Sequence, residues 1–255
     1  MHRRSFLAAL GAGALGSLAG CQTAVGAVAL PDVPESRLKE GGWELRNRTK
    51  NETVFKKEYS FITVEAVASS VLYADAALRK EVRQDTLGAI DTDLALFSAT
   101  RIDMAPSVDE LGPVQAEVED RIQQQAIAEL KGRMQAAGIA DIERTETASL
   151  DVASGVSAEL TELSGVYRVP DIEFPVREDT TITIQGTDLS IEALLAVWAA
   201  NGNYLVTGGA YPAENFARVT ETDLSEAISV TIDVDLGLTP AAYREELLGL
   251  MRNVS

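Results

Sequence analysis

Apolar and polar residues alternate along much of the chain, and this pattern predicts β-strands. Two or three strands are predicted between Trp43 and Tyr73, where Val54-Phe55 and the run 59–64 are rich in β-branched and aromatic residues. The polar residues 49–52 predict a turn within this region. Later strands are predicted at 93–102, 142–152, 156–169, 172–184, 191–200 and 204–210.

Several residues refine the later strands. Asn201-Gly202 lies between two apolar runs and indicates a hairpin. The nearly continuous apolar run 191–198 predicts a strand buried on both faces. Pro175 places its own strand at a sheet edge. Gly208-Gly209 has two interpretations, a close approach of a ligand to the backbone or a β-bulge.

The longest predicted helix begins near Asp109, includes Pro113 in its first turns and ends before Gly138, over about 110–137. Its apolar residues recur with helical period, and acidic and amide residues fill much of the remainder. This pattern favours a helix that lies on a sheet with a solvated back, and a partner-binding helix is the alternative. The apolar stripe consists of Val114, Val118, Ile122, Ile127, Leu130 and Met134.

Two shorter helices are predicted, at 74–87 and at 240–252. In the second, Thr239 is the expected N-cap and Pro240 the first helical residue. We expect this helix to dock on the domain through the apolar residues Tyr243, Leu247, Leu250 and Val254.

The order of these elements predicts an α+β fold, a mostly antiparallel β-sheet flanked by helices. The order resembles the sheet-and-helix sandwich of PsbP-like and Mog1-like proteins. No internal repeat and no shift in composition divides the chain. Residues 42–255 are therefore expected to form a single globular domain.

The first 21 residues resemble an export signal followed by a lipid-attachment site. Their residues 18–21 resemble a lipobox, which implies cleavage before Cys21 and lipid on its sulfur. An ordinary membrane helix is the alternative, but the apolar stretch 6–20 is shorter than the roughly 20 residues that a span needs. The residues that match the twin-arginine signal are Arg3, Arg4, Phe6 and Leu7.

These motifs predict an exported protein, attached by lipid on Cys21 to the outer face of the cytoplasmic membrane. Residues 22–40 contain small residues and two prolines without a sustained period, so 21–41 is expected to be a lipidated N-terminus and flexible tether. A flexible tether of this length has a root-mean-square reach of roughly 25 Å. It would hold the domain away from the membrane surface.

The chain is strongly acidic, with 39 acidic and 22 basic side chains and a formal net charge of −17. This sign is wrong for a nucleic-acid partner. Arginine outnumbers lysine by 16 to 6. With the N-terminal motifs, this composition resembles that of uncharacterised haloarchaeal lipoproteins that carry a domain of unknown function. An acidic bacterial lipoprotein is the alternative, and neither resemblance implies an activity.

Cleavage before Cys21 would remove His2, the single histidine, and leave the single cysteine attached to lipid. The mature domain would then lack imidazole and free thiol. This excludes Ser-His-Asp and Cys-His catalysis, zinc sites built on His or Cys, and disulfides. No cofactor or metal site is predicted.

The remaining candidate sites are sequons and pairs of acids. Asn47 and Asn51 lie in Asn-x-Thr sequons and are candidates for N-glycosylation, and Asn253 lies in a third sequon. Asp91-Thr92-Asp93 and Asp233-Val234-Asp235 could share a hard cation, but a solvated acidic surface is the favoured interpretation.

Function is expected to be non-enzymatic. The favoured hypothesis is a lipid-anchored module that binds an envelope protein or a small solute. The alternatives are a surface hydrolase that uses carboxylates or an oxygen-ligated metal, and a structural envelope component. A cleft containing a carboxylate of raised pKa would favour the hydrolase.

Overall fold

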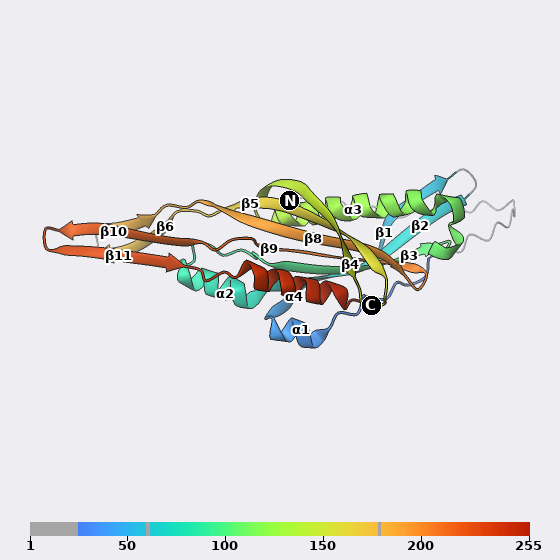
Figure 1. Ribbon diagram of the computed structural model, residues 1–255, viewed down its shortest axis with the longest axis horizontal. Helices are drawn as coiled ribbons and strands as arrows, with labels where there is room; N and C mark the ends of the chain where they lie inside the picture. Colours follow the sequence, from blue (N-terminus) through green and yellow to red (C-terminus); the bar gives the residue numbers. More distant parts are fainter. Residues whose placement is uncertain (1–24, 60–61, 178–179) are drawn as a thin grey trace, which may run out of the picture.

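The computed structural model describes residues 25–59, 62–177 and 180–255. Its largest element is a seven-stranded sheet (Figure 1). The strands are β1 (Trp43–Tyr59), β2 (Ile62–Asp75), β3 (Leu96–Ala105), β4 (Ile139–Asp151), β5 (Ser157–Arg168), β8 (Asp188–Ala200) and β9 (Asn203–Pro212). They lie in the order β1-β2-β3-β9-β8-β5-β4, and every neighbouring pair is antiparallel.

Two hairpins extend beyond one end of this sheet and give the molecule its elongated shape (Figure 1). One pairs β6 (Ile172–Arg177) with β7 (Thr180–Ile184), and the other pairs β10 (Ala217–Ser225) with β11 (Ile228–Asp235). We call the two hairpins together the arm. Ile182 and Ile184 of the arm are buried, whereas Val219 and Ile228 are exposed.

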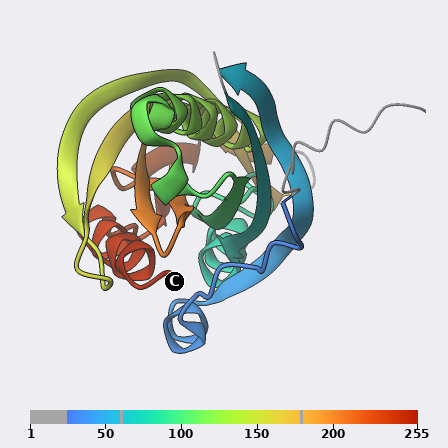
Figure 2. The same ribbon diagram turned by 90° about the vertical axis from the view of Figure 1, so that its right-hand side faces the viewer.

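Helices cover both faces of the sheet (Figure 2). α3 (Gln115–Ala136) lies on one face, where it contacts β4, β8 and β9. α2 (Ala76–Asp85) and α4 (Pro240–Arg252) lie on the opposite face, with the short α1 (Glu35–Glu40) beside them. Within the described residues, no helix is long and apolar enough to cross a membrane.

The strand order explains the position of α3. β3 lies in the middle of the sheet and β4 at its edge, so the chain between them must cross a face of the sheet. Val118, Ile122, Leu130 and Met134 are buried on that face, which confirms the predicted amphipathic helix. Its start differs from the prediction, because 108–114 form two 3₁₀ turns before the α-helix begins.

The predicted fold class is confirmed, since the antiparallel strands and the helices of the described residues make an α+β arrangement. β8 is buried on both faces from Ala193 to Trp198, as its apolar run predicts. Asn201 and Gly202 have φ of 52° and 79° and form the predicted hairpin turn. The proline-containing β6 belongs to a two-stranded sheet, so it is an edge strand as predicted.

Two predictions in the strand regions are wrong, and one hairpin was not predicted. The predicted turn at 49–52 is a bulge inside the continuous strand β1, where the register shifts and Asn51 has φ of 57°. The predicted strand 172–184 is the hairpin β6–β7. The hairpin 217–235 was not predicted, because one of its faces is solvated and its apolar residues are interrupted by Thr, Glu and Asp.

The flexible tether predicted for 22–40 is wrong for residues 28–40. Val28, Val33 and Leu38 are buried, and α1 occupies 35–40. The backbone of Asp32 also pairs with that of Ser255, with N···O distances of 2.7 and 3.1 Å. The N-terminal segment is therefore part of the packed domain from residue 28 onward.

Gly208-Gly209 fits neither predicted interpretation. The β8–β9 register is continuous through both residues, so there is no bulge. A Cβ atom on Gly209 would lie 2.2 Å from the carbonyl oxygen of Leu96 and 2.6 Å from Leu247 of α4. Gly209 is therefore required by the close packing of α4 on the sheet.

The C-terminal helix spans the predicted residues, and Leu247 and Leu250 are buried. Thr239 is the N-cap residue, as predicted, although its side chain makes no capping hydrogen bond. Pro240 is the first helical residue, as predicted. Val254 is buried but lies beyond the end of the helix.

Candidate ligand cleft

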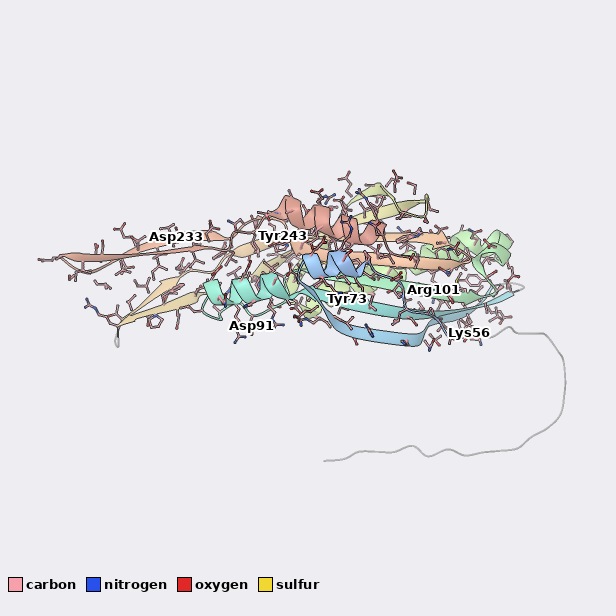
Figure 3. The ribbon with its side chains drawn as sticks, turned by 90° about the horizontal axis from the view of Figure 1, so that it is seen from below. Lys56, Tyr73, Asp91, Arg101, Asp233 and Tyr243 are labelled. Carbon is pink, nitrogen blue, oxygen red and sulfur yellow. The ribbon has the colours of Figure 1, made fainter. Side chains whose placement is uncertain are left out.

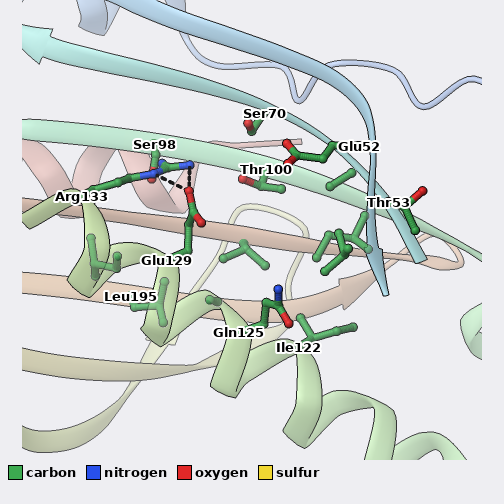
Figure 4. A pocket seen from close by; sticks show the side chains of 16 residues that line it. Glu52, Thr53, Ser70, Ser98, Thr100, Ile122, Gln125, Glu129, Arg133 and Leu195 are labelled. Atoms are coloured by element: carbon green, nitrogen blue, oxygen red, sulfur yellow. Dashed lines mark hydrogen bonds and ion pairs between the residues drawn. The ribbon is translucent and has the colours of Figure 1, made fainter. Parts of the chain in front are cut away.

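A cleft of about 170 Å³ separates α3 from the sheet (Figure 4). Its walls come from α3 on one side and from β1, β2, β3, β8 and β9 on the other. In β2 and β3 the sheet wall consists of every second residue, those that point to the α3 face, whereas the irregular strand β1 contributes three consecutive residues, 52–54. In β3 these residues are Ser98, Thr100 and Ile102.

The floor of the cleft is mostly apolar. Ile122 and Leu130 contribute to it from α3, Ile102 from β3, and Leu195 and Val206 from the neighbouring strands. All five side chains are buried. The floor therefore suits the apolar part of a small molecule.

Hydroxyl groups interrupt this floor along β2 and β3, at Ser70, Ser98 and Thr100 (Figure 4). The three residues are partly exposed within the cleft. The Ser98 hydroxyl donates a 3.3 Å hydrogen bond to the Gly208 carbonyl. These groups can orient a polar ligand.

Charged side chains stand at the rim. Arg133 donates to Glu129 at 3.1 Å, one turn earlier on α3, and Glu52 of β1 faces this pair across the cleft (Figure 4). The Arg133 side chain is 20% exposed and that of Glu129 is 65% exposed. The rim thus places two carboxylates and one guanidinium where a bound molecule could contact them.

The cleft is suited to binding more than to nucleophilic catalysis. Its lining residues include no histidine, cysteine, lysine or tyrosine. The hydroxyl of Ser98 is bonded to a backbone carbonyl and not to a base. A nucleophile paired with an activating base, the usual arrangement for covalent catalysis, is therefore not formed by these side chains.

A second polar cluster lies on the opposite face, under α4. Arg244 forms two hydrogen bonds with Glu162 and one of 3.0 Å with the Tyr211 hydroxyl, which itself donates to Glu192. Burial and the bond to Glu192 raise the pKa of Tyr211 well above its ordinary value. This cluster joins β5, β8 and β9 to α4, so we assign it to the docking of the helix.

Three of the four carboxylates in the predicted acidic pairs have partners within the protein. Asp91 and Asp93 both bind Arg79, and Asp91 has a lowered pKa because of that hydrogen bond. Asp235 accepts hydrogen bonds from Asn215 and Gly237. Figure 3 shows Asp233 on the arm and Asp91 beside α2. Among the described residues, no three His, Cys, Asp or Glu side chains are placed to hold a metal ion.

Asp75 has a raised pKa, chiefly because of burial. Its carboxylate accepts a 2.8 Å hydrogen bond from the Leu78 N–H and caps α2. Asp75 does not line the cleft. Burial therefore raises the pKa of Asp75 although the capping hydrogen bond lowers it, and this residue gives the cleft no acid catalyst.

The two candidate glycosylation sites on β1 differ in environment. Asn47 is exposed. The Asn51 side chain is also exposed, but its Oδ1 accepts a 2.8 Å hydrogen bond from the Val28 N–H. Asn253 donates to the Gly249 carbonyl at the end of α4. The geometry thus makes Asn47 the more accessible acceptor.

The predicted export and lipidation residues lie outside the described part of the chain; they are Arg3, Arg4, Phe6, Leu7 and Cys21. Sequence reasoning missed the residues of the cleft. The available signal was the presence of Ser98 and Thr100 on the same strand face as the buried Ile102. Polar residues on an inward-facing row indicate a solvated gap in the packing.

Comparison with known proteins identifies the family. No curated protein and no solved structure matches the chain. A family model described as "Domain of unknown function (DUF6517)" matches residues 30–255, which include α1, the whole sheet, the arm and α4. The chain therefore belongs to this family of unknown function.

Proposed function

We propose that this protein is an exported, lipid-anchored binding module on the outer face of the cytoplasmic membrane, and that it holds a small solute between α3 and the sheet. The observation that carries the proposal is the cleft, with its apolar floor, four hydroxyl-bearing residues and charged rim. Small-molecule sites combine an apolar lining with a few convergent polar groups in this way. The ligand expected is a small molecule with an apolar part and several hydrogen-bonding groups.

Filling the cleft tests this function. Ala126 lines the cleft on α3, whereas Ala128 of the same helix is exposed and does not. We expect Ala126→Phe to abolish binding, measured as small molecules that copurify with the protein and are released on denaturation. Ala128→Phe is the matched control and should retain them. Equal recovery from the two variants would show that the cleft is not the binding site.

The membrane attachment rests on the motifs at residues 3–7 and 18–21. We expect Cys21→Ser to release the protein from membranes or to block its processing, because the sulfur that carries the lipid is lost. Conversion of Arg3-Arg4 to Lys-Lys should stop export. Membrane fractionation of cells producing each variant measures both effects. A serine variant that stays bound as firmly as the parent contradicts the anchor.

The acidic composition supports a haloarchaeal origin as part of the same proposal. Carboxylates bind water strongly, and molar salt screens their mutual repulsion. A domain that carries this charge is suited to an extracellular face in concentrated brine. A nucleic-acid partner remains unexpected for the same reason.

A further inference from the structure

Hydrogen bonds fix the N-terminal segment to β1 and β2 at Val28. The Val28 N–H donates to Asn51 Oδ1 at 2.8 Å, and the Val28 carbonyl accepts from Ser69 Oγ at 2.9 Å. The Asn51 N–H donates to the same Ser69 oxygen at 3.2 Å, which closes a ring of three bonds. Val28 itself is 4% exposed. The chain therefore leaves the domain from this one place.

The distance from this place to the lipid is short if Cys21 is the anchor. Seven residue steps separate Cys21 from Val28. They span at most about 25 Å when fully extended and have a typical reach of about 15 Å. A segment of this length holds the part of the sheet that binds Val28 near the membrane surface.

The surface around Val28 belongs to the part of the chain in which acidic and basic side chains nearly balance. Residues 25–101 contain 11 basic and 12 acidic side chains, whereas 102–255 contain 9 and 27. On β1, Leu45 is 40% exposed, and Arg48 and Lys50 are exposed without an ion pair among the described residues. Leu45 and Arg48 lie opposite Tyr73 and Val71 of β2, on the face that also carries Ser69.

The excess acid lies in the later part of the chain. The arm and the β4 edge belong to the acidic part of the chain, and Figure 3 shows Asp233 of the arm and Lys56 of β1 at opposite ends of the molecule. Attraction of basic side chains to anionic headgroups is weak for each residue and falls off within a Debye length. The short connection therefore brings the β1–β2 region near the membrane, where exposed basic side chains of β1 can meet the headgroups at contact distance.

We propose that the β1–β2 face around Val28, with Leu45, Arg48 and Lys50, lies against an anionic lipid surface. This inference rests on the lipid anchor at Cys21 in the proposed function. We assign this face to the lipid headgroup layer for two reasons. The chain from Cys21 reaches the domain here, and exposed basic side chains lie beside that point.

Lysine labelling tests this orientation. The full lipidated protein is reconstituted into vesicles of phosphatidylcholine and phosphatidylglycerol and, separately, kept in detergent. A water-soluble amine reagent then reports on Lys50 and on Lys131 of α3, each quantified by mass spectrometry. We expect labelling of Lys50 to be several-fold slower on vesicles than in detergent, with Lys131 unchanged. Equal rates for Lys50 in the two preparations, or protection of Lys131 instead, overturn the inference.

A longer connection provides the matched variant. An insert of about 20 Gly/Ser residues between Gln22 and Thr23 gives the whole segment a reach of about 28 Å. The insert leaves the domain unchanged and should return the labelling of Lys50 to the rate seen in detergent. The same insertion after Gly155, in the exposed β4–β5 turn, should not. Protection that persists with the long connection contradicts orientation by the short segment.

The anchor itself is tested separately. If the parent protein fails to sediment with vesicles and behaves like Cys21→Ser, the lipid anchor is wrong and the inference falls with it. If the parent sediments but Lys50 is labelled as in detergent, the anchor stands and the proposed orientation is wrong. Protection of Lys50 in intact cells but not on vesicles indicates a protein on this face and overturns the lipid assignment.

Discussion

Tyr204 is a buried residue whose hydroxyl has no hydrogen-bond partner within the described structure. It lies on β9, on the face that α3 covers. Burial, with a contribution from Glu119, raises the pKa of this tyrosine to about 12. An unsatisfied buried hydroxyl lowers stability, because its bonds to water are lost on folding and not replaced.

Tyr204→Phe is therefore expected to stabilise the protein by about 1 kcal/mol at neutral pH. In the parent, the raised pKa means that the fold favours the neutral phenol. The tyrosine of the unfolded chain ionises near pH 10. The stability that the fold gains by favouring the neutral phenol is therefore complete below pH 10 and is lost as the pH rises toward 12. Denaturant unfolding from pH 8 to 11.5 measures both effects. A variant that loses as much stability as the parent above pH 10 contradicts the assignment to Tyr204.

At the scale of elements, the Arg244 cluster connects α4 to three strands. The Arg244 side chain is 35% exposed and Glu162 is 16% exposed. Removal of the guanidinium would leave the carboxylates of Glu162 and Glu192 near each other without their cation. The cluster should thus contribute more than a fully solvated ion pair does.

We expect Arg244→Met to lower the free energy of unfolding by about 1–3 kcal/mol, because methionine preserves much of the packing but leaves these partly buried acids unpaired. Arg168→Met is the control, since Arg168 and Asp141 lie 3.8 Å apart and are 75% and 70% exposed. Its effect should stay below about 0.5 kcal/mol. Chemical denaturation of both variants makes the comparison, and equal losses contradict a special role for the cluster.

The sequence predicted elements well where one residue period continued over many positions. The stripe of α3 and the apolar run of β8 are examples, and both are buried as expected. Prediction from the sequence failed where contacts between distant residues determine the local structure. The polar stretch at Asn51 continues β1 because its side chain and backbone bind Val28 and Ser69, which are distant in sequence. The cleft was missed for a similar reason, since its rim combines α3 with β1.

At the scale of the whole molecule, the net charge of −17 is the dominant feature. Repulsion between carboxylates acts over roughly 10 Å at 0.1 M salt and over about 3 Å at 1 M. Residues 102–255, with 27 acids and 9 bases, experience most of it. This part includes β4, the arm and α4.

We expect the melting temperature to fall and the transition to lose cooperativity as potassium chloride is diluted from molar concentration to about 0.1 M. Circular dichroism at a series of salt concentrations measures the change. The control is an uncharged osmolyte at the same water activity, which should not restore the melting temperature because it does not screen charges. A melting temperature that is constant across the series removes the argument for a halophilic origin.

The pairing of Asp32 with Ser255 brings the two ends of the domain together. With N···O distances of 2.7 and 3.1 Å between their backbones, a short peptide could join Ser255 to the N-terminal segment. New ends could then be opened at Gly155, which lies in an exposed turn. Circular permutation would thus move the point of attachment to the far edge of the sheet, and the domain could be presented to a membrane in a second orientation.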